Sequence, residues 1–188
     1  VMTMKSFCLT LSAFFVALGT LTAGLFYIPV GVSKCFPMQS LINCLAGVLI
    51  GPKKAAIVAF LIALLRNLLG TGSLLAFPGS IVGAYLAGMF FTRTKKEGAS
   101  LLGEMIGTGL VAALIASFMS TYLMGKTVPF YFFVIPFGMS ALGGALLAGL
   151  IMKSPLMTAV KKKIRKMSLG PRITTRTSGC RSFLLMKP

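Results

Sequence analysis

The side chains in this sequence that could do chemistry are mainly amides and hydroxyls, with an arginine near the end of an apolar segment. Gln39 and Asn43 are four residues apart, so they share one face of a helix. Arg66 and Asn67 follow a later apolar run. Acid and base catalysis would have to use Lys, Tyr or Cys, because the chain has no His and only two carboxylates. No such group has an evident activator, so we do not expect an enzyme.

The sequence gives no sign of a metal or cofactor site. Its four cysteines lack C-x-x-C spacing and there is no His, so zinc is not expected. Residues 120–127 end like a phosphate-binding P-loop, but the segment begins with Ser instead of Gly and no strand precedes it. We therefore expect no cofactor, and any ATP-driven step would need a partner protein.

The composition is that of a membrane protein. Apolar residues make up 56% of the chain and charged residues 11%, whereas a soluble domain carries roughly a quarter charged residues. The apolar residues fall into runs separated by Pro, Gly and charge, as a hydrocarbon core about 30 Å thick requires. The net charge of +17 could suggest nucleic acid, but nearly all the cations lie between the runs or in the last 36 residues. We therefore expect lipid, not nucleic acid, around the chain.

We expect an all-α integral membrane protein with six transmembrane helices, multi-pass in the plasma membrane. Both termini should be cytoplasmic, because even without the tail beyond Lys153 this orientation places seven cations inside and three outside. The three outer cations are Lys34, Arg66 and Lys126. The expected spans are 6–26, 38–50, 55–69, 74–91, 99–124 and 128–152.

Two of these spans are too short to cross the membrane alone, which points to a pocket. Residues 38–50 and 55–69 fall below the roughly 20 residues that a straight helix needs. Their outer ends adjoin 32–37 and 70–80, which contain polar residues, Gly and Pro. Irregular backbone at membrane depth is tolerated only inside protein or along a cavity. We therefore expect a pocket that opens outward.

The aromatic residues are concentrated toward the expected outer side of the membrane, where ten of the nineteen lie. A belt at the membrane surface explains part of the pattern. A belt should appear on both faces, however, and aromatic rings beside amides also suit a small, flat, weakly polar ligand.

Three charged residues leave alternatives open. Arg66 could reach the lipid headgroups, hold loop carbonyls, or donate to a ligand, and Lys34 has a similar choice. Glu104 lies roughly 8 Å from the inner end of its span, so we assign it to helix packing or a partner contact. Ala13 and Ala17, four residues apart on the first helix, could form a groove that admits a partner helix.

Several motifs together resemble the ThiW family. The matching segments are YIPVG at 27–31, KCFP at 34–37 with Gln39 and Asn43, LIGP at 49–52, LRNLLGTG at 65–72 with AFPGS at 76–80, and GE at 103–104 with GTG at 107–109. The resemblance covers about residues 6–152, and the RNLLGTG and AFPGS run is its most specific part.

The ThiW resemblance implies the substrate-binding (S) component of an energy-coupling factor (ECF) transporter for vitamins. Such an S component is a six-helix bundle with an outward pocket, coupled to a transmembrane T subunit and two ABC-type ATPases. The implied substrate is hydroxyethylthiazole, a thiamin precursor, or its phosphate. An A-x-x-x-A motif on the first helix contacts the T subunit in these proteins, and Ala13 to Ala17 match it. Family members often have His after the matching Gln, where Ser40 stands here.

The sequence supports one main hypothesis and leaves two alternatives open. The main hypothesis is a thiazole-binding S component, with residues 1–152 as the membrane domain and 153–188 as a basic, disordered cytoplasmic tail whose lysine cluster lies on anionic lipid. The alternatives are a membrane scaffold, and an intramembrane transferase that uses Cys35 or Lys34. The expected substrate-binding residues are Lys34, Phe36, Gln39, Asn43, Arg66, Asn67, Thr71, Phe77, Tyr131 and Phe133.

Overall fold

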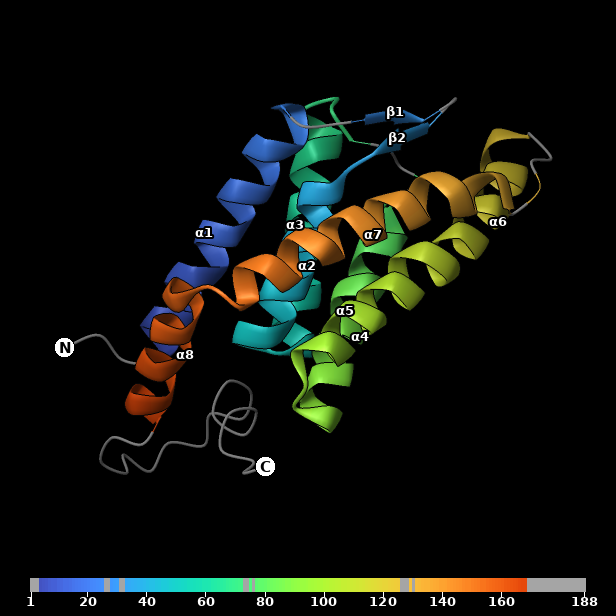
Figure 1. Ribbon diagram of the computed structural model, residues 1–188. Helices are drawn as coiled ribbons and strands as arrows, with labels where there is room; N and C mark the ends of the chain where they lie inside the picture. The colour runs from blue at the N-terminus through green and yellow to red at the C-terminus, as the bar shows by residue number, and fades with distance from the viewer. Residues whose placement is uncertain are drawn as a thin grey trace.

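The computed structural model describes residues 4–25, 28–30, 33–72, 75, 77–125, 129 and 131–168. This part of the chain is almost wholly helical, which confirms the prediction of a helical fold. Figure 1 shows the helices gathered into one bundle, with a short β-hairpin at one end and the start of the first helix and the last helix at the other.

The elements follow one another with short connections. In chain order they are α1 (Met4–Leu25), β1 (Ile28–Val30), β2 (Ser33–Cys35), α2 (Pro37–Ile50), α3 (Pro52–Leu68), α4 (Phe77–Thr94), α5 (Glu97–Glu104), the π-helix η2 (Met105–Val111), α6 (Ala112–Met124), α7 (Tyr131–Met152) and α8 (Pro155–Ser168). The backbone stays helical at both ends of η2, so α5, η2 and α6 form one continuous helix. Each of the six expected spans therefore corresponds to one helix.

Two helices are long and apolar enough to cross a membrane by length and composition. They cover Glu97–Tyr122 and Tyr131–Met152 in the described part of the chain. Ser6–Thr22 and Pro37–Ile50 are apolar but shorter. Six crossings therefore remain a prediction. The hairpin of β1 and β2, which pairs Ile28 with Cys35, was not predicted.

Local sequence explains where α2 and α3 begin and how the chain reverses between them. Pro37 and Pro52 occupy first-turn positions, where the missing N–H of proline costs no helical hydrogen bond. Gly51 between the helices has φ 88°, a conformation that a residue without Cβ adopts at little cost. The two helices therefore run back to back with a single residue between them.

Helix α2 lies at the centre of the bundle. All of its residues from Gln39 to Ile50 are buried, as expected for a helix that is apolar around its whole circumference. It packs against α1, α3, α4 and α7. The approach to α4 is close, because a Cβ added at Gly47 would lie 2.8 Å from the Gly88 nitrogen. Small residues thus fix the separation of these helices.

The outside of the bundle is apolar. Large hydrophobic side chains are exposed on several helices, at Leu9, Leu21, Leu68, Leu110, Leu114, Phe118, Leu146 and Leu150. An apolar surface distributed over so many elements is costly in water and suits a hydrocarbon solvent.

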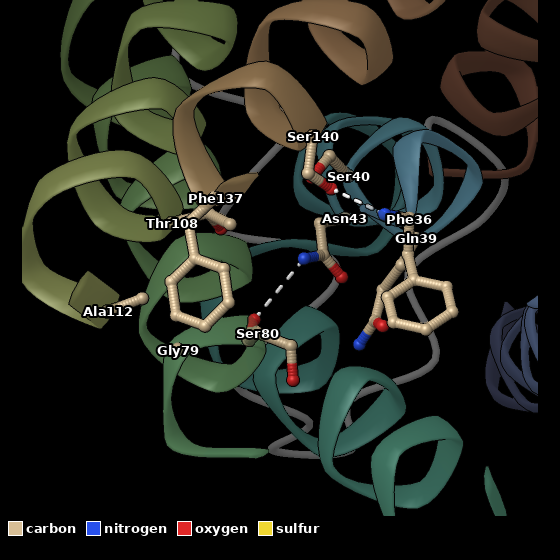
Figure 2. A pocket seen from close by; sticks show the side chains of 10 residues that line it. All are labelled: Phe36, Gln39, Ser40, Asn43, Gly79, Ser80, Thr108, Ala112, Phe137 and Ser140. Atoms are coloured by element: carbon tan, nitrogen blue, oxygen red, sulfur yellow. Dashed lines mark hydrogen bonds between the residues drawn. The ribbon is translucent and has the colours of Figure 1, made fainter. Parts of the chain in front are cut away.

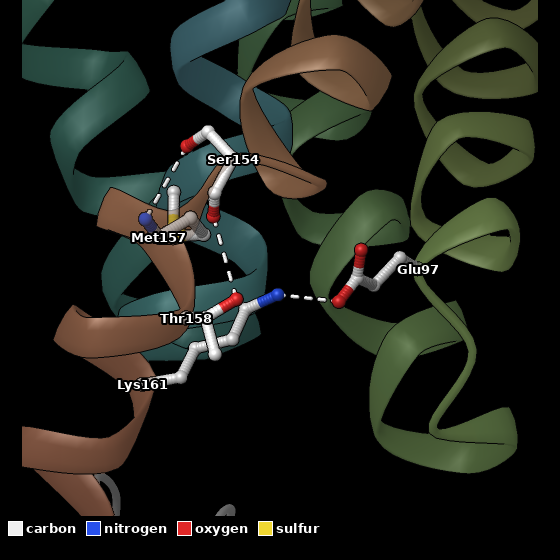
Figure 3. Close-up of polar contacts among 5 residues, drawn as sticks. All are labelled: Glu97, Ser154, Met157, Thr158 and Lys161. Carbon is white, nitrogen blue, oxygen red and sulfur yellow. Dashed lines mark hydrogen bonds and ion pairs between the residues drawn. The ribbon is translucent and has the colours of Figure 1, made fainter.

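The expected disordered tail begins instead with a helix, α8. Its side chains Met157 and Ile164 are buried against the core that includes α1 and α2. Lys161 forms an ion pair with Glu97 at the start of α5, shown in Figure 3. Apolar residues three or four positions apart form one side of α8, and this side packs against the core. The helix was not predicted, because the expectation for this segment rested on its charges alone. The rest of the tail, 169–188, lies outside the described residues.

Candidate functional site

A pocket lies inside the bundle among α2, α4, η2, α6 and α7. The empty space that these elements enclose, together with the open mouth of the pocket, is about 360 Å³. Figure 2 shows side chains converging on it from these elements. The lining residues are Phe36, Gln39, Ser40, Asn43, Gly79, Ser80, Thr108, Ala112, Phe137 and Ser140.

Asn43 joins three elements at the inner part of the pocket. Its Nδ2 donates to the Ser80 carbonyl of α4 at 3.3 Å and to Glu104 Oε1 of α5 at 3.0 Å. Thr108 Oγ1 of η2 also donates to Glu104 Oε1, at 2.8 Å. A polar network of this kind in a low-dielectric interior fixes the orientation of its members.

Glu104 is the buried centre of this network. Its side chain is 0% exposed, and Ser40 lies beside the carboxyl group. Its second oxygen, Oε2, makes no hydrogen bond within the described part of the chain. Of the two roles left open by the sequence, packing within the bundle fits this position, and a contact on a partner surface does not.

Arg66 is buried beside the pocket, so its side chain does not reach the surface of the bundle. The residue is 2% exposed. Its Nη1 donates to Gln39 Oε1, and its Cζ lies 3.9 Å from the centroid of the Phe36 ring. Its own carbonyl accepts the N–H groups of Thr71 at 3.0 Å and Gly72 at 2.9 Å. Arg66 therefore supports two lining residues and anchors the loop after α3.

The predicted residues divide into two groups in the structure. Phe36, Gln39 and Asn43 line the pocket, and Arg66 contacts the first two from behind. Asn67, Thr71, Phe77, Tyr131 and Phe133 are not among the residues that line the cavity.

Those other side chains have local roles. Asn67 donates to the Ala63 carbonyl of its own helix at 2.8 Å. Thr71 donates to the Arg66 carbonyl at 3.3 Å. Phe77 packs edge-on against Phe60, with ring centroids 5.3 Å apart.

The remaining candidates lie near the hairpin end. Phe133 is buried and packs against the lining residue Phe137, with ring centroids 6.1 Å apart. Tyr131, which begins α7, is 62% exposed. Lys34 pairs with Pro29 in the hairpin, and its side chain lies outside the described residues.

Several lining residues were not among the ten expected substrate-binding residues. Ser140 accepts the Phe36 N–H at 3.1 Å and so joins α7 to the start of α2. Gly79 and Ala112 pack so closely that a Cβ on Gly79 would lie 2.3 Å from the Ala112 Cβ. Isolated Ser and Thr residues in apolar helices were the available signal for Ser80, Thr108 and Ser140, because such groups usually face the bundle interior.

The described residues contain no group of three His, Cys, Asp or Glu side chains that could hold a metal ion. On α1, the two alanines of the expected partner motif, Ala13 and Ala17, are both exposed. The predicted groove residues are thus accessible to another helix.

A polar pocket inside a bundle with an apolar outer surface is the arrangement of a membrane protein that binds a small solute. The family model of ThiW, described as thiamine-precursor transporter protein, matches residues 9–157. The chain therefore belongs to the ThiW family, and its role is transport and not catalysis. A search of curated proteins and a search of solved structures each gave no match.

Proposed function

We propose that this chain is the substrate-binding subunit of an ECF-type vitamin transporter. It captures hydroxyethylthiazole or its phosphate at the outer face of the plasma membrane for ATP-driven uptake. The observation that carries the proposal is the pocket of amides, hydroxyls and aromatic rings in a ThiW-family chain.

The lining matches the chemistry of a thiazole alcohol. Phe36 and Phe137 offer ring faces to a flat heteroaromatic ring, which gains from stacking and from leaving water. Gln39, Asn43 and Thr108 offer the few hydrogen-bonding groups that orient such a ligand.

The proposed membrane arrangement has six crossings with both termini inside. The apolar outer faces of the helices support it. So do the exposed cations Lys53, Arg93 and Lys96, which occur at the end of the bundle where α3 starts and α4 ends, opposite the hairpin in Figure 1. The hairpin end would then face outward.

The proposed partners are an ECF T subunit and two ABC-type ATPases. Ala13 and Ala17 are exposed on α1, and their small side chains let another helix approach closely. The nearby exposed side chains Leu9 and Phe14 would add apolar contact area around that approach.

Calorimetry on the purified chain in lipid nanodiscs tests the substrate. We expect saturable binding of hydroxyethylthiazole or its phosphate, and weaker binding in Asn43→Leu because this change removes a lining amide. Thr121→Val is the control, since the one hydrogen bond of the Thr121 hydroxyl within the described part of the chain goes to the Ser117 carbonyl of its own helix, at 3.1 Å. No saturable binding of either compound or of thiamin rejects the proposal and favours the scaffold alternative.

A further inference from the structure

Building on the proposed thiazole-binding role, we infer that the pocket has a fixed direction of hydrogen bonding. Asn43 and Thr108 accept a hydroxyl hydrogen at its inner end, and Gln39 donates to the ring nitrogen at its outer end. The pocket therefore binds the free alcohol with its hydroxyl pointing inward, and it disfavours the phosphate ester.

The orientation of the Asn43 amide follows from its partners. The Ser80 carbonyl oxygen and Glu104 Oε1, which also accepts a hydrogen bond from Thr108, are both acceptors. The two hydrogens of Asn43 Nδ2 therefore point to Ser80 and Glu104. Only Oδ1 remains for a ligand. Figure 2 shows this oxygen on the side of Gln39 and Phe36, turned away from Ser80. The amide therefore presents an acceptor to the cavity.

Thr108 presents an acceptor for the same reason. Its hydroxyl has one hydrogen, and that hydrogen is donated to Glu104 Oε1 at 2.8 Å. The remaining lone pair of Oγ1 can only accept. Both donors point to the same carboxyl oxygen, so the result holds whether or not the other oxygen carries a proton. Glu104 does not line the pocket, and it acts as a positioning residue for Asn43 and Thr108.

The outer end has the opposite character. An arginine side chain can only donate hydrogen bonds, so the Gln39 atom that faces Arg66 must be the acceptor Oε1. The Gln39 nitrogen, Nε2, is then left to donate to a ligand. Figure 2 shows the Gln39 nitrogen on the Ser80 side of the amide, away from the Phe36 ring. Two further nitrogens of Arg66, Nε and Nη2, are buried without a hydrogen bond in the described structure, which makes this end more positive.

The two ends are spaced to suit the proposed ligand. Gln39 and Asn43 are one helical turn apart, which is about 6 Å along the axis of α2. The ring nitrogen and hydroxyl oxygen of hydroxyethylthiazole lie about 5 Å apart by ordinary bond lengths. The alcohol can satisfy both ends at once.

The phosphate ester lacks the hydrogen that the inner end requires. With its phosphate inward, acceptors would face acceptors, and buried polar groups would lose their partners. With its phosphate outward, near Arg66, the ring would turn inward and leave Asn43 Oδ1 and Thr108 unpaired. Either orientation is weaker than that of the alcohol.

The test compares three compounds by calorimetry on the full chain in nanodiscs: hydroxyethylthiazole, its O-methyl ether and its monophosphate. We expect the ether and the phosphate to bind about 10- to 100-fold more weakly than the alcohol, because each leaves buried acceptors unpaired. Equal binding of alcohol and ether, or tighter binding of the phosphate, would overturn the inference while leaving the proposed function intact. Failure of every compound to bind would instead reject the proposed function.

Variants then locate the inner end. Thr108→Val keeps the side-chain shape and removes the acceptor, so the ratio of alcohol to ether affinity should fall while ether binding persists and reports a folded pocket. Thr121→Val should leave the ratio unchanged, because the Thr121 hydroxyl donates to the Ser117 carbonyl of its own helix and Thr121 is not among the residues that line the pocket. An unchanged ratio in Thr108→Val would contradict the inference.

Glu104 has its own pair of variants. Glu104→Met removes the shared acceptor and frees the Asn43 amide to turn, so selectivity for the alcohol should decrease. Glu104→Gln retains a carbonyl oxygen that can accept from Asn43 and Thr108, so it should restore selectivity. A residue with only a packing role would not move this ratio, and equal ratios in the two variants would exclude the positioning role.

Discussion

Gly83 offers a direct test of the network below the pocket. A Cβ added at this position would lie 2.1 Å from Thr108 Oγ1 and 2.8 Å from Glu104 Oε2. Normal contacts of this kind are about 3.4 Å or longer, so Gly83→Ala forces the Thr108 hydroxyl to move by about 1 Å or more. Threonine is stiff at χ1, and the movement breaks its hydrogen bond to Glu104.

The expected cost of Gly83→Ala combines three effects. Loss of a buried hydrogen bond costs about 1–3 kcal/mol and overpacking costs about 1–3 kcal/mol. Replacing a helical glycine by alanine stabilises the folded state by about 0.5–1 kcal/mol. The net destabilisation is therefore about 3 kcal/mol. We also expect weaker binding of hydroxyethylthiazole, by about 10-fold or more, because the displaced Thr108 side chain lines the pocket.

The assay is thermal melting of the purified variant in one detergent, followed by calorimetry. Gly138→Ala is the matched control, since Gly138 is also a glycine within a helix of the bundle and a Cβ there would meet nothing within 4 Å. This control should melt at or slightly above the parent temperature and bind normally. If Gly83→Ala behaves like Gly138→Ala in both measurements, the described packing of Thr108 and Glu104 against α4 is wrong.

Three further changes test other parts of the structure. Arg66→Met should lower the melting temperature and weaken binding about 10-fold, because Gln39 loses its donor and the guanidinium no longer packs on the Phe36 ring; unchanged binding in calorimetry would remove Arg66 from the site. Ala13→Trp should abolish co-purification with the proposed T subunit while substrate binding remains, since Ala13 is exposed on α1; retained co-purification would exclude Ala13 from the proposed interface. Lys161→Ala should change stability by less than about 1 kcal/mol in thermal melting, because its pair with Glu97 is partly exposed to solvent; a larger loss would mean that α8 depends on this ion pair for docking.

Part of the site could be predicted from helical periodicity. The four-residue spacing of Gln39 and Asn43 predicts a shared face, and both residues line the pocket. The depth of Glu104 could be approximated from the sequence, which placed it roughly 8 Å from the inner end of its span. In the structure Glu104 is seven residues from the start of α5 and Asn43 is seven residues from the end of α2, so each lies about 10 Å into its helix.

The contact between these two residues could not be predicted in the same way. Equal depth does not say which helices are neighbours or which faces meet, and the linear sequence separates the residues by 61 positions. The π-helix η2 adds a further change, because its wider turn shifts the faces of the helix that carries Thr108. A straight α-helical projection therefore cannot place this side chain.

Sequence by itself determined the helical segments, the membrane-like character of the chain and, through its motifs, the ThiW family. Hydrophobic runs and prolines act locally, so they carry that information without a neighbour. Only the tertiary structure decided which polar side chains converge. Close contacts such as Gly47 with Gly88 and Gly107 with Gly83 set the rotation and separation of the helices, and those two quantities depend on packing between distant segments.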